Sequence, residues 1–236
     1  MAIPWITIDS VQTDEGVLEL RQRGERDFLI TVDGRVLMNS RAHRTEEALG
    51  VLACGHLAAV PEPRVLLGGL GMGYTLRAVL DALPTAARVT LAEVNPAVVD
   101  WCKGPLAELA GDAATDPRVR IEIDDVARIV DIAAGRRHPG RFHAVVYDLY
   151  TGPYTRTHVK SDPLYGNRAL AAVRAVLTPG GVFAVWGEEY DAGFARRLET
   201  AGFETNVRRP GGGGPRHVVY LGRRPGSLDG GKASPS

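Results

Sequence analysis

The sequence predicts an α/β fold: a doubly wound, mostly parallel sheet of seven strands, preceded by a small antiparallel β region. From Arg64 onward, short apolar segments alternate with helical ones, as in parallel strands joined by right-handed crossover helices. The N-terminal residues instead contain short β-type runs separated by turns, and the Asp33-Gly34 pair is a strong hairpin signal. The last two predicted strands follow one another without a long helix, so we expect them to form a hairpin.

The predicted elements fall into three segments of the chain. Residues 1–43 form the N-terminal β-hairpin region, with strand-like runs at 5–8, 17–20, 28–32 and 35–38. A helix is expected next, from about Thr45, whose side chain can cap it, to about Ala59, before Pro61 and Pro63. Residues 44–222 form the main domain, with strand cores at 65–67, 89–91, 119–123, 144–147, 182–186, 204–207 and 217–221 and helices at 75–83, 126–134 and 164–177. The Gly-, Pro- and Ser-rich segment 223–236 is expected to be disordered.

Composition and charge narrow the classes of protein to which this chain can belong. The 236 residues contain 28 Lys and Arg and 28 Asp and Glu, so no net charge favours nucleic acid or an acidic membrane surface. The N-terminus lacks a secretory leader and no apolar run approaches the ~20 residues that span a bilayer, which predicts a cytoplasmic protein without membrane contact. Cys54 and Cys102 lack metal-type or CxxC spacing, so we expect reduced thiols and no metal site. Exposed edges of the N-terminal sheet are compatible with a homodimer.

The chemistry is expected where the strands of the main domain end, beginning with the glycine-rich turn at residues 68–73. Gly69, Gly71 and Gly73 follow a strand and precede a helix, so a ligand can approach the backbone and the free N–H groups of the helix start. Glu93 ends the second strand, 20 residues after Gly73, where a carboxylate can accept both hydroxyls of a ribose. Together these residues predict a nucleoside site.

The spacing of the glycines indicates which nucleoside is bound. Nicotinamide sites favour GxGxxG, whereas here the third glycine comes one position earlier, which favours a sulfonium nucleoside such as S-adenosylmethionine. Asp124 and Asp125 follow the third strand, where one carboxylate can accept the exocyclic amine of adenine and the other can cap the next helix. We favour Asp125 for the adenine contact.

Asp148 is the leading catalytic candidate because it ends the fourth strand, at the edge of the sheet where ligands bind. A carboxylate there can orient an amine or hydroxyl and take its proton as it attacks the sulfonium carbon. Tyr150 is the second candidate, although Tyr150 and Tyr154 can equally well pack their loop onto the sheet. Glu188, after the fifth strand, either adds acidity to the pocket or begins the next helix.

Four motifs, taken in order, relate the chain to a known family. They are GLGMGYTLR at 69–77, EVNPAVV at 93–99, DPRV at 116–119 and LTPGGV at 177–182. In this combination the chain resembles the spermidine synthase-like family, within the class I S-adenosylmethionine-dependent methyltransferase superfamily. The resemblance covers roughly residues 16–222. It implies the Rossmann-like fold, a small-molecule acceptor, and a donor that is S-adenosylmethionine or its decarboxylated form.

The chain departs from that family at two positions of the expected substrate pocket. Spermidine synthases have GGGDGGTLR, whose Asp helps to hold the aminopropyl end of the donor, and here this position is Met72. They also have an Asp-x-x-Asp loop, and here its second Asp is Thr151. Because a polyamine dication is costly to bury without these carboxylates, the leading prediction is methyl transfer from intact S-adenosylmethionine to a small amine, hydroxyl or carboxylate. Aminopropyl transfer is the alternative, and a non-catalytic nucleoside-binding protein is a third.

Overall fold

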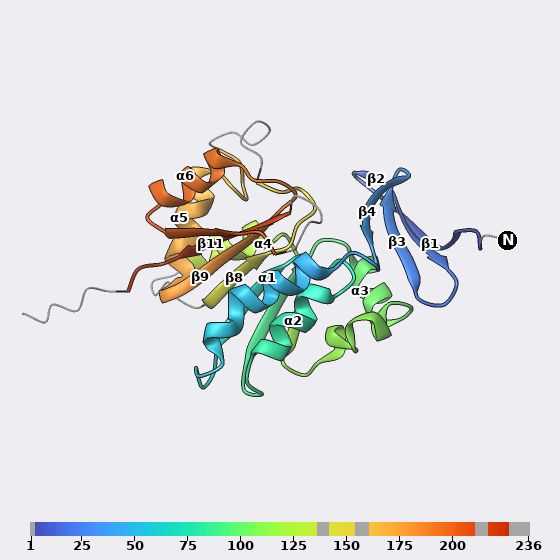
Figure 1. Ribbon diagram of the computed structural model, residues 1–236, viewed down its shortest axis with the longest axis horizontal. Helices are drawn as coiled ribbons and strands as arrows, with labels where there is room; N and C mark the ends of the chain where they lie inside the picture. Colours follow the sequence, from blue (N-terminus) through green and yellow to red (C-terminus); the bar gives the residue numbers. More distant parts are fainter. Residues whose placement is uncertain (1–2, 136–141, 154–160, 211–216, 227–236) are drawn as a thin grey trace, which may run out of the picture.

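Alternating apolar and polar residues build a four-stranded antiparallel sheet at the N-terminus of the computed structural model (Figure 1). Its strands, in spatial as well as chain order, are β1 (Ile6–Thr13), β2 (Gly16–Arg23), β3 (Asp27–Val32) and β4 (Arg35–Asn39). The buried face consists of apolar side chains that include Leu18, Leu20, Phe28, Ile30 and Val32. Asp33 and Gly34 connect β3 to β4 with positive φ at both residues, as a tight hairpin requires.

The second sheet has seven strands in the order β10-β11-β9-β8-β5-β6-β7. In chain order they are β5 (Arg64–Gly68), β6 (Arg88–Glu93), β7 (Val119–Ile123), β8 (Phe142–Tyr147), β9 (Leu177–Gly187), β10 (Glu204–Arg208) and β11 (Val218–Arg223). The strands β5 to β9 pair in parallel, whereas β11 is antiparallel to both of its neighbours, β9 and β10. The predicted fold class and the C-terminal hairpin are therefore confirmed.

Helices cover both faces of the seven-stranded sheet. One face packs against α1 (Arg44–Cys54), α2 (Tyr74–Ala82) and α3 (Pro96–Lys103), and the other against α4 (Val126–Ala134), α5 (Asn167–Val176) and α6 (Ala192–Thr200). Successive strand residues alternate between the two cores: Val65 and Leu67 belong to the first and Leu66 to the second. Short 3₁₀ turns lie at η1 (Gly55–Leu57), η2 (Ala107–Ala110) and η3 (Ala113–Thr115). The structure describes residues 3–135, 142–153, 161–210 and 217–226, so the tail predicted to be disordered lies mostly outside it.

Two short helices and one strand start differ from the sequence-based prediction. The helices α3 and α6 are capped by the side chains of Asn95 and Asp191, respectively, and their 8 and 9 residues give little periodicity to detect. The strand β9 begins at Leu177, directly after α5, rather than near residue 182. The reason is a pair of backbone hydrogen bonds in which Gly180 and Gly181 bind the backbone of Arg224, which extends the ladder toward α5.

The N-terminal sheet is attached to the main domain near the start of α2. The indole N–H of Trp101, in α3, donates to the carboxylate of Asp9 in β1 at 2.6 Å. The hydroxyl of Tyr74, at the start of α2, donates to the carbonyl of Ser40 at 3.0 Å. Figure 1 shows the N-terminal sheet at one end of the molecule, beside α3 and away from β9 and β11. The sheet therefore lies next to the turn between β5 and α2.

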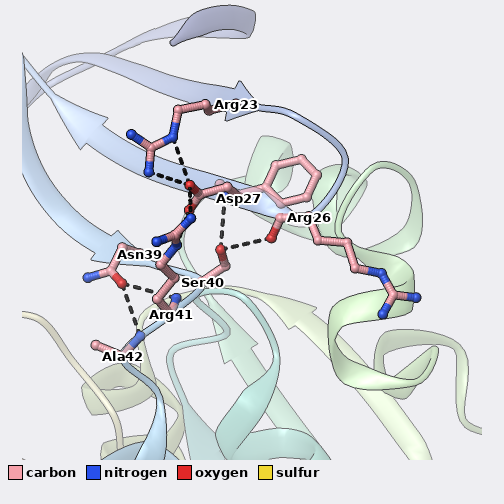
Figure 2. Close-up of polar contacts among 8 residues, drawn as sticks. Arg23, Arg26, Asp27, Asn39, Ser40, Arg41 and Ala42 are labelled. Carbon is pink, nitrogen blue, oxygen red and sulfur yellow. Dashed lines mark hydrogen bonds and ion pairs between the residues drawn. The ribbon is translucent and has the colours of Figure 1, made fainter. Parts of the chain in front are cut away.

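A polar network fixes the segment that connects β4 to α1 (Figure 2). The carboxylate of Asp27 binds the guanidinium groups of Arg23 and Arg41, at 2.5 and 2.8 Å. Ser40 accepts a hydrogen bond from the N–H of Phe28 and donates one to the carbonyl of Arg26. Because the connection is held at several points, the first turn of α1 has a defined position relative to the N-terminal sheet.

Cys54 and Cys102 are both buried, free thiols. Burial raises the pKa of each thiol to about 12, so both stay protonated at neutral pH. Cys102 donates its S–H to the carbonyl of Gly71 at 3.2 Å, which makes it a packing contact of the glycine turn. Across the described ranges, no helix combines the length and apolar character needed to cross a membrane.

Candidate active site

The glycine turn between β5 and α2 is shaped by close approaches that only glycine permits. Gly69, Gly71 and Gly73 have φ of 89°, 52° and 86°, the left-handed region that other residues rarely adopt. A Cβ on Gly69 would lie 2.2 Å from the carbonyl oxygen of Asp148, and a Cβ on Gly71 would lie 2.9 Å from the sulfur of Met38. The glycines therefore allow the catalytic candidate Asp148 and the N-terminal sheet to approach the turn.

Glu93, the predicted ribose ligand, accepts backbone hydrogen bonds with both oxygens of its carboxylate. One carboxylate oxygen accepts the N–H of Leu70 at 3.0 Å and the other accepts the N–H of Asn95 at 2.9 Å. Burial raises the pKa of Glu93, and the backbone hydrogen bonds oppose this shift. Each oxygen keeps a second lone pair, so Glu93 can brace the glycine turn and still accept a hydroxyl of a ligand.

The two aspartates after β7 have different partners. Asp125 caps α4, because its side chain accepts the N–H of Ala127 at 2.8 Å. Asp124 forms an ion pair with Arg128 at 2.8 Å, and this hydrogen bond lowers the pKa of its carboxyl. The capping role that the sequence left open thus falls to Asp125. Asp125 is exposed, and its contact with adenine stays a prediction.

Asp148 directly follows β8 and lies against the glycine turn. Its N–H donates to the carbonyl of Gly68 at 2.9 Å, which continues the ladder between β5 and β8 by one residue. Its carboxylate accepts a hydrogen bond from the hydroxyl of Thr75, in the first turn of α2, at 2.6 Å. Asp148 is therefore held by β5 through its backbone and by α2 through its side chain, and it remains partly exposed.

The surroundings of Asp148 raise the pKa of its carboxyl into the neutral range. Burial raises the pKa of Asp148 to about 7, the Thr75 hydrogen bond opposes the rise, and the charge of Glu46 adds to it. A carboxyl with a pKa near the working pH can both accept and return a proton. Among the described residues at this edge of the sheet, Asp148 is therefore the strongest candidate for a proton acceptor.

The first turn of α1 also reaches this edge. From the sequence, His43, Glu46 and Glu47 are placed where the N-terminal sheet meets the glycine turn, with a role in the site and a structural role both left open. Thr75 lies 3.1 Å from the carbonyl of Glu46. The hydroxyl of Thr45 donates to the carboxylate of Glu46 at 2.7 Å, and it contacts the indole nitrogen of Trp186 and the ring of His217, from β9 and the approach to β11. The first turn of α1 thus contacts β9, the approach to β11, and Thr75, the residue that binds Asp148.

The other predicted pocket residues lie in different surroundings. Tyr150 donates its hydroxyl to Glu15, in the turn between β1 and β2, and burial together with this hydrogen bond raises its pKa to about 12. The carbonyl of Thr151 accepts the hydroxyl of Tyr165 at 3.0 Å. Tyr154 lies outside the described residues. Glu188 is exposed directly after β9 and does not begin α6, which starts at Ala192.

Met72 lies in the apolar core and has no exposed surface. The sequence-based argument assumed that its side chain replaces an acid facing the donor. A side chain that is sealed in the core does not repel or attract a donor carboxylate, so its identity cannot distinguish the two donors. Met72 therefore gives no reason to exclude the decarboxylated donor.

A separate hollow lies on the N-terminal sheet, lined by Ile3 and by four residues of the network in Figure 2: Arg23, Arg26, Asp27 and Arg41. Two of its three guanidinium groups are already paired with Asp27. None of these residues is among the predicted site residues. Within the described ranges, no three His, Cys, Asp or Glu side chains are grouped as metal ligands.

Comparisons with known proteins agree with this geometry. The family model of the spermine/spermidine synthase domain matches residues 51–191. The polyamine aminopropyltransferase of Clostridium tetani is 30% identical over 129 residues, which is 54% of this chain and 42% of that protein. That of Pyrobaculum calidifontis is 32% identical over 129 residues, 53% of this chain and 42% of that protein. The chain thus spans less than half the length of these curated relatives.

Among solved structures, the spermidine synthase of Thermotoga maritima superposes with a TM-score of 0.71. The alignment covers 92% of this chain and 72% of that one, at 22% sequence identity. At this identity the likeness establishes the fold, and the chemistry has to be argued from the residues at the sheet edge.

Proposed function

The chain belongs to the spermine/spermidine synthase family, and from this premise we propose that it is an aminopropyltransferase. It would transfer the aminopropyl group of decarboxylated S-adenosylmethionine to the nitrogen of a small amine. The observation that carries the proposal is Asp148, a carboxyl with a pKa of about 7 held against the glycine turn by Thr75. The curated relatives are named as enzymes of this type.

The expectation of methyl transfer from intact S-adenosylmethionine is wrong. The family model and the curated relatives are those of aminopropyltransferases. The expectation rested on Met72 as a residue that faces the donor, and the structure places Met72 in the core. The statement that holds is the coarser one, that the chain is a transferase of the spermidine synthase type.

In the proposed reaction, a neutral amine nitrogen attacks the aminopropyl carbon bound to the sulfonium. The new C–N bond forms as the C–S bond breaks, and sulfur takes the bonding electron pair to leave as the neutral thioether of methylthioadenosine. The nitrogen then carries an extra proton, which Asp148 accepts. Most of the acceleration comes from holding nitrogen, carbon and sulfur in line.

The donor is proposed to lie over the glycine turn. Its ribose would meet Glu93, whose carboxylate is already oriented by the N–H groups of Leu70 and Asn95. Its adenine would lie near Asp125, at the start of α4. Asp148 would then face the sulfonium end, because its backbone contacts both Gly68 and Gly69.

Donor choice can be tested directly by mass spectrometry. The purified chain is incubated with decarboxylated S-adenosylmethionine and a panel of amines, and the release of methylthioadenosine is measured. A parallel reaction with intact S-adenosylmethionine monitors S-adenosylhomocysteine. Amine-dependent release of methylthioadenosine supports the proposal. Binding of the donor without turnover of any amine would refute it and favour a nucleoside-binding protein.

A further inference from the structure

Glu46 is a buried carboxylate without a cationic partner among the residues that the structure describes. It exposes 9% of its surface, and within those residues its one side-chain hydrogen bond comes from the hydroxyl of Thr45, which donates to Oε2 at 2.7 Å. Neither of its oxygens lies within ion-pair distance of a Lys, Arg or His in the part of the chain that the structure describes. An ionised carboxylate in this setting is costly unless a bound cation compensates it.

The position of Glu46 in the first turn of α1 does not by itself explain this burial. Acidic residues are favoured near helix N-termini, but Glu47 occupies the same turn, is exposed and pairs with His43 at 2.9 Å. A helix start needs no second acid turned into the protein. The burial of Glu46 therefore points to a ligand.

Glu46 adjoins the proposed proton acceptor. The hydroxyl of Thr75 lies 2.6 Å from the carboxylate of Asp148 and 3.1 Å from the backbone carbonyl of Glu46, so Thr75 joins the Asp148 side chain to the backbone of Glu46. The charge of Glu46 is close enough to raise the pKa of Asp148. Two neighbouring carboxylates destabilise one another, and a cationic group bound to Glu46 relieves the repulsion.

A chain of hydrogen bonds orients the Glu46 carboxylate. Thr45 has one hydroxyl proton, and it is donated to Glu46. The contacts of Thr45 Oγ1 with Trp186 at 3.4 Å and with His217 at 3.1 Å must then be donated by the ring nitrogens. Side chains from β9 and from the approach to β11 thus fix an acid on α1, as expected for a built binding group.

We propose that Glu46 determines acceptor specificity by binding the non-reacting ammonium group of a diamine, while Asp148 receives the proton from the reacting nitrogen. This inference rests on the proposed aminopropyl transfer. The loop after β8 has Thr151 where a second acid is expected. Glu46 would take over the role of that missing carboxylate. The indole ring of Trp186, hydrogen-bonded to Thr45, adds an aromatic surface that suits a cation.

The test compares two acceptors that differ by one ammonium group, 1,4-diaminobutane and 1-aminobutane. For the wild type we expect a clear preference for the diamine. E46Q keeps the shape and removes the charge, so KM for the diamine should rise about 10- to 100-fold, the effect of one charge-assisted hydrogen bond. Removing the Glu46 charge also lowers the pKa of Asp148, so both acceptors are compared at about pH 9, where Asp148 is ionised in both proteins. There the loss of E46Q should be much larger for the diamine than for the monoamine, and E46D should be intermediate for the diamine.

E47Q is the matched control, because it removes the same charge one residue away from a side chain that faces solvent. It should change both KM values by less than about twofold, as expected for an exposed pair. The thermal midpoint of each variant verifies folding, and E46Q removes an uncompensated buried charge, so it should fold. Equal losses of E46Q with both amines, or no diamine preference in the wild type, would overturn the assignment.

A binding experiment separates this inference from the proposed reaction. Calorimetric titration of 1,4-diaminobutane is carried out in the presence of methylthioadenosine, for the wild type and for E46Q. Binding that requires Glu46 supports the inference even if no transfer is observed, in which case the proposed reaction alone fails. Equal binding by both proteins, or no binding by the wild type, refutes the role of Glu46.

Discussion

Thr75 sits between two acceptors but has only one proton to donate. When Asp148 is ionised, Thr75 donates to its carboxylate; when Asp148 is protonated, the carboxyl can donate to Thr75, which then donates to the carbonyl of Glu46. Both protonation states of Asp148 are therefore hydrogen-bonded without movement of the backbone. A general base that must gain and lose a proton in each cycle needs this property.

Replacing Thr75 with Val should alter the pH dependence of the reaction. With Asp148 as the proposed base, the reaction requires its ionised form, so kcat/KM of the wild type should rise with pH through about 7. The Thr75 hydrogen bond lowers the pKa of Asp148, so T75V should move this midpoint to higher pH. T75S, which keeps the hydroxyl, should restore the wild-type profile. An unchanged midpoint in T75V would contradict the coupling of the two residues.

Replacing Asp148 with Asn should reduce kcat and increase stability. Loss of the proton acceptor should lower kcat by about 10²- to 10⁴-fold while donor binding, measured by calorimetry, is retained. A fully active D148N would exclude Asp148 as the base.

The pKa of Asp148 is raised in the folded state, so its protonated form favours folding. This contribution is present below about pH 4 and is lost as the pH rises toward about 7. D148N should therefore unfold at higher urea concentration than the wild type at pH 8, by about 1–2 kcal/mol after allowance for partial exposure, and show little difference at pH 4.

The sequence identified the candidate site residues at strand ends, left the role of Glu46 open and gave no signal for Thr75, whose place depends on helix packing. Glu93 and Asp148 follow strands of one parallel sheet, so their common edge could be inferred from the order of elements. Glu46 and Thr75 meet because α1 packs closely on α2, where a Cβ on Gly50 would lie 2.7 Å from Ala78. No spacing in the sequence encodes that contact.

At the level of elements, the turn between β5 and α2 is constrained from both sides. Gly69 has no space for a side chain, because the backbone oxygen of Asp148 occupies the position of its Cβ. A change in this turn would therefore displace the catalytic candidate as well as the donor. The glycine motif could be located from the sequence because its residues are consecutive. Its contacts with Met38 and Asp148 could not, because they depend on the fold.

Substituting Gly69 with Ala should destabilise the fold by about 2 kcal/mol or more, because φ is 89° and the new Cβ meets backbone. Gly55 is the matched control: its φ is −56° and no atom lies within 4 Å of its Cβ position. G55A should stabilise the protein by about 0.5 kcal/mol through the unfolded state. Urea unfolding of both variants measures the contrast, and similar effects would show that the close approach at Gly69 is relaxed in solution.

On the scale of the whole molecule, Tyr150 connects the loop after β8 to the N-terminal sheet. Its hydroxyl binds Glu15, and the guanidinium group of Arg35 lies 5.9 Å from its ring. The sequence marked Tyr150 as a candidate because an aromatic residue in the loop after Asp148 could line the acceptor pocket. The contact with Glu15 could not be foreseen, since it depends on how the two sheets are placed relative to one another.

A double-mutant cycle distinguishes the two roles of Tyr150. If Tyr150 acts by tying the loop to the N-terminal sheet, then Y150F and E15Q should raise KM to a similar extent, and the double variant should be no worse than either. A direct role in catalysis would instead lower kcat in Y150F alone, with additive effects in the double variant. Steady-state release of methylthioadenosine supplies both parameters.

The strand order of the main sheet has a consequence for synthesis on the ribosome. β11 follows all other described strands in the sequence, yet it lies between β9 and β10 rather than at an edge. Until residues 218–223 have left the exit tunnel, β10 has no neighbour in the sheet and one edge of β9, rich in apolar residues, is open to other nascent chains. The sheet is thus complete only after β11 has emerged, and a product truncated before residue 218 should depend on chaperones to remain soluble.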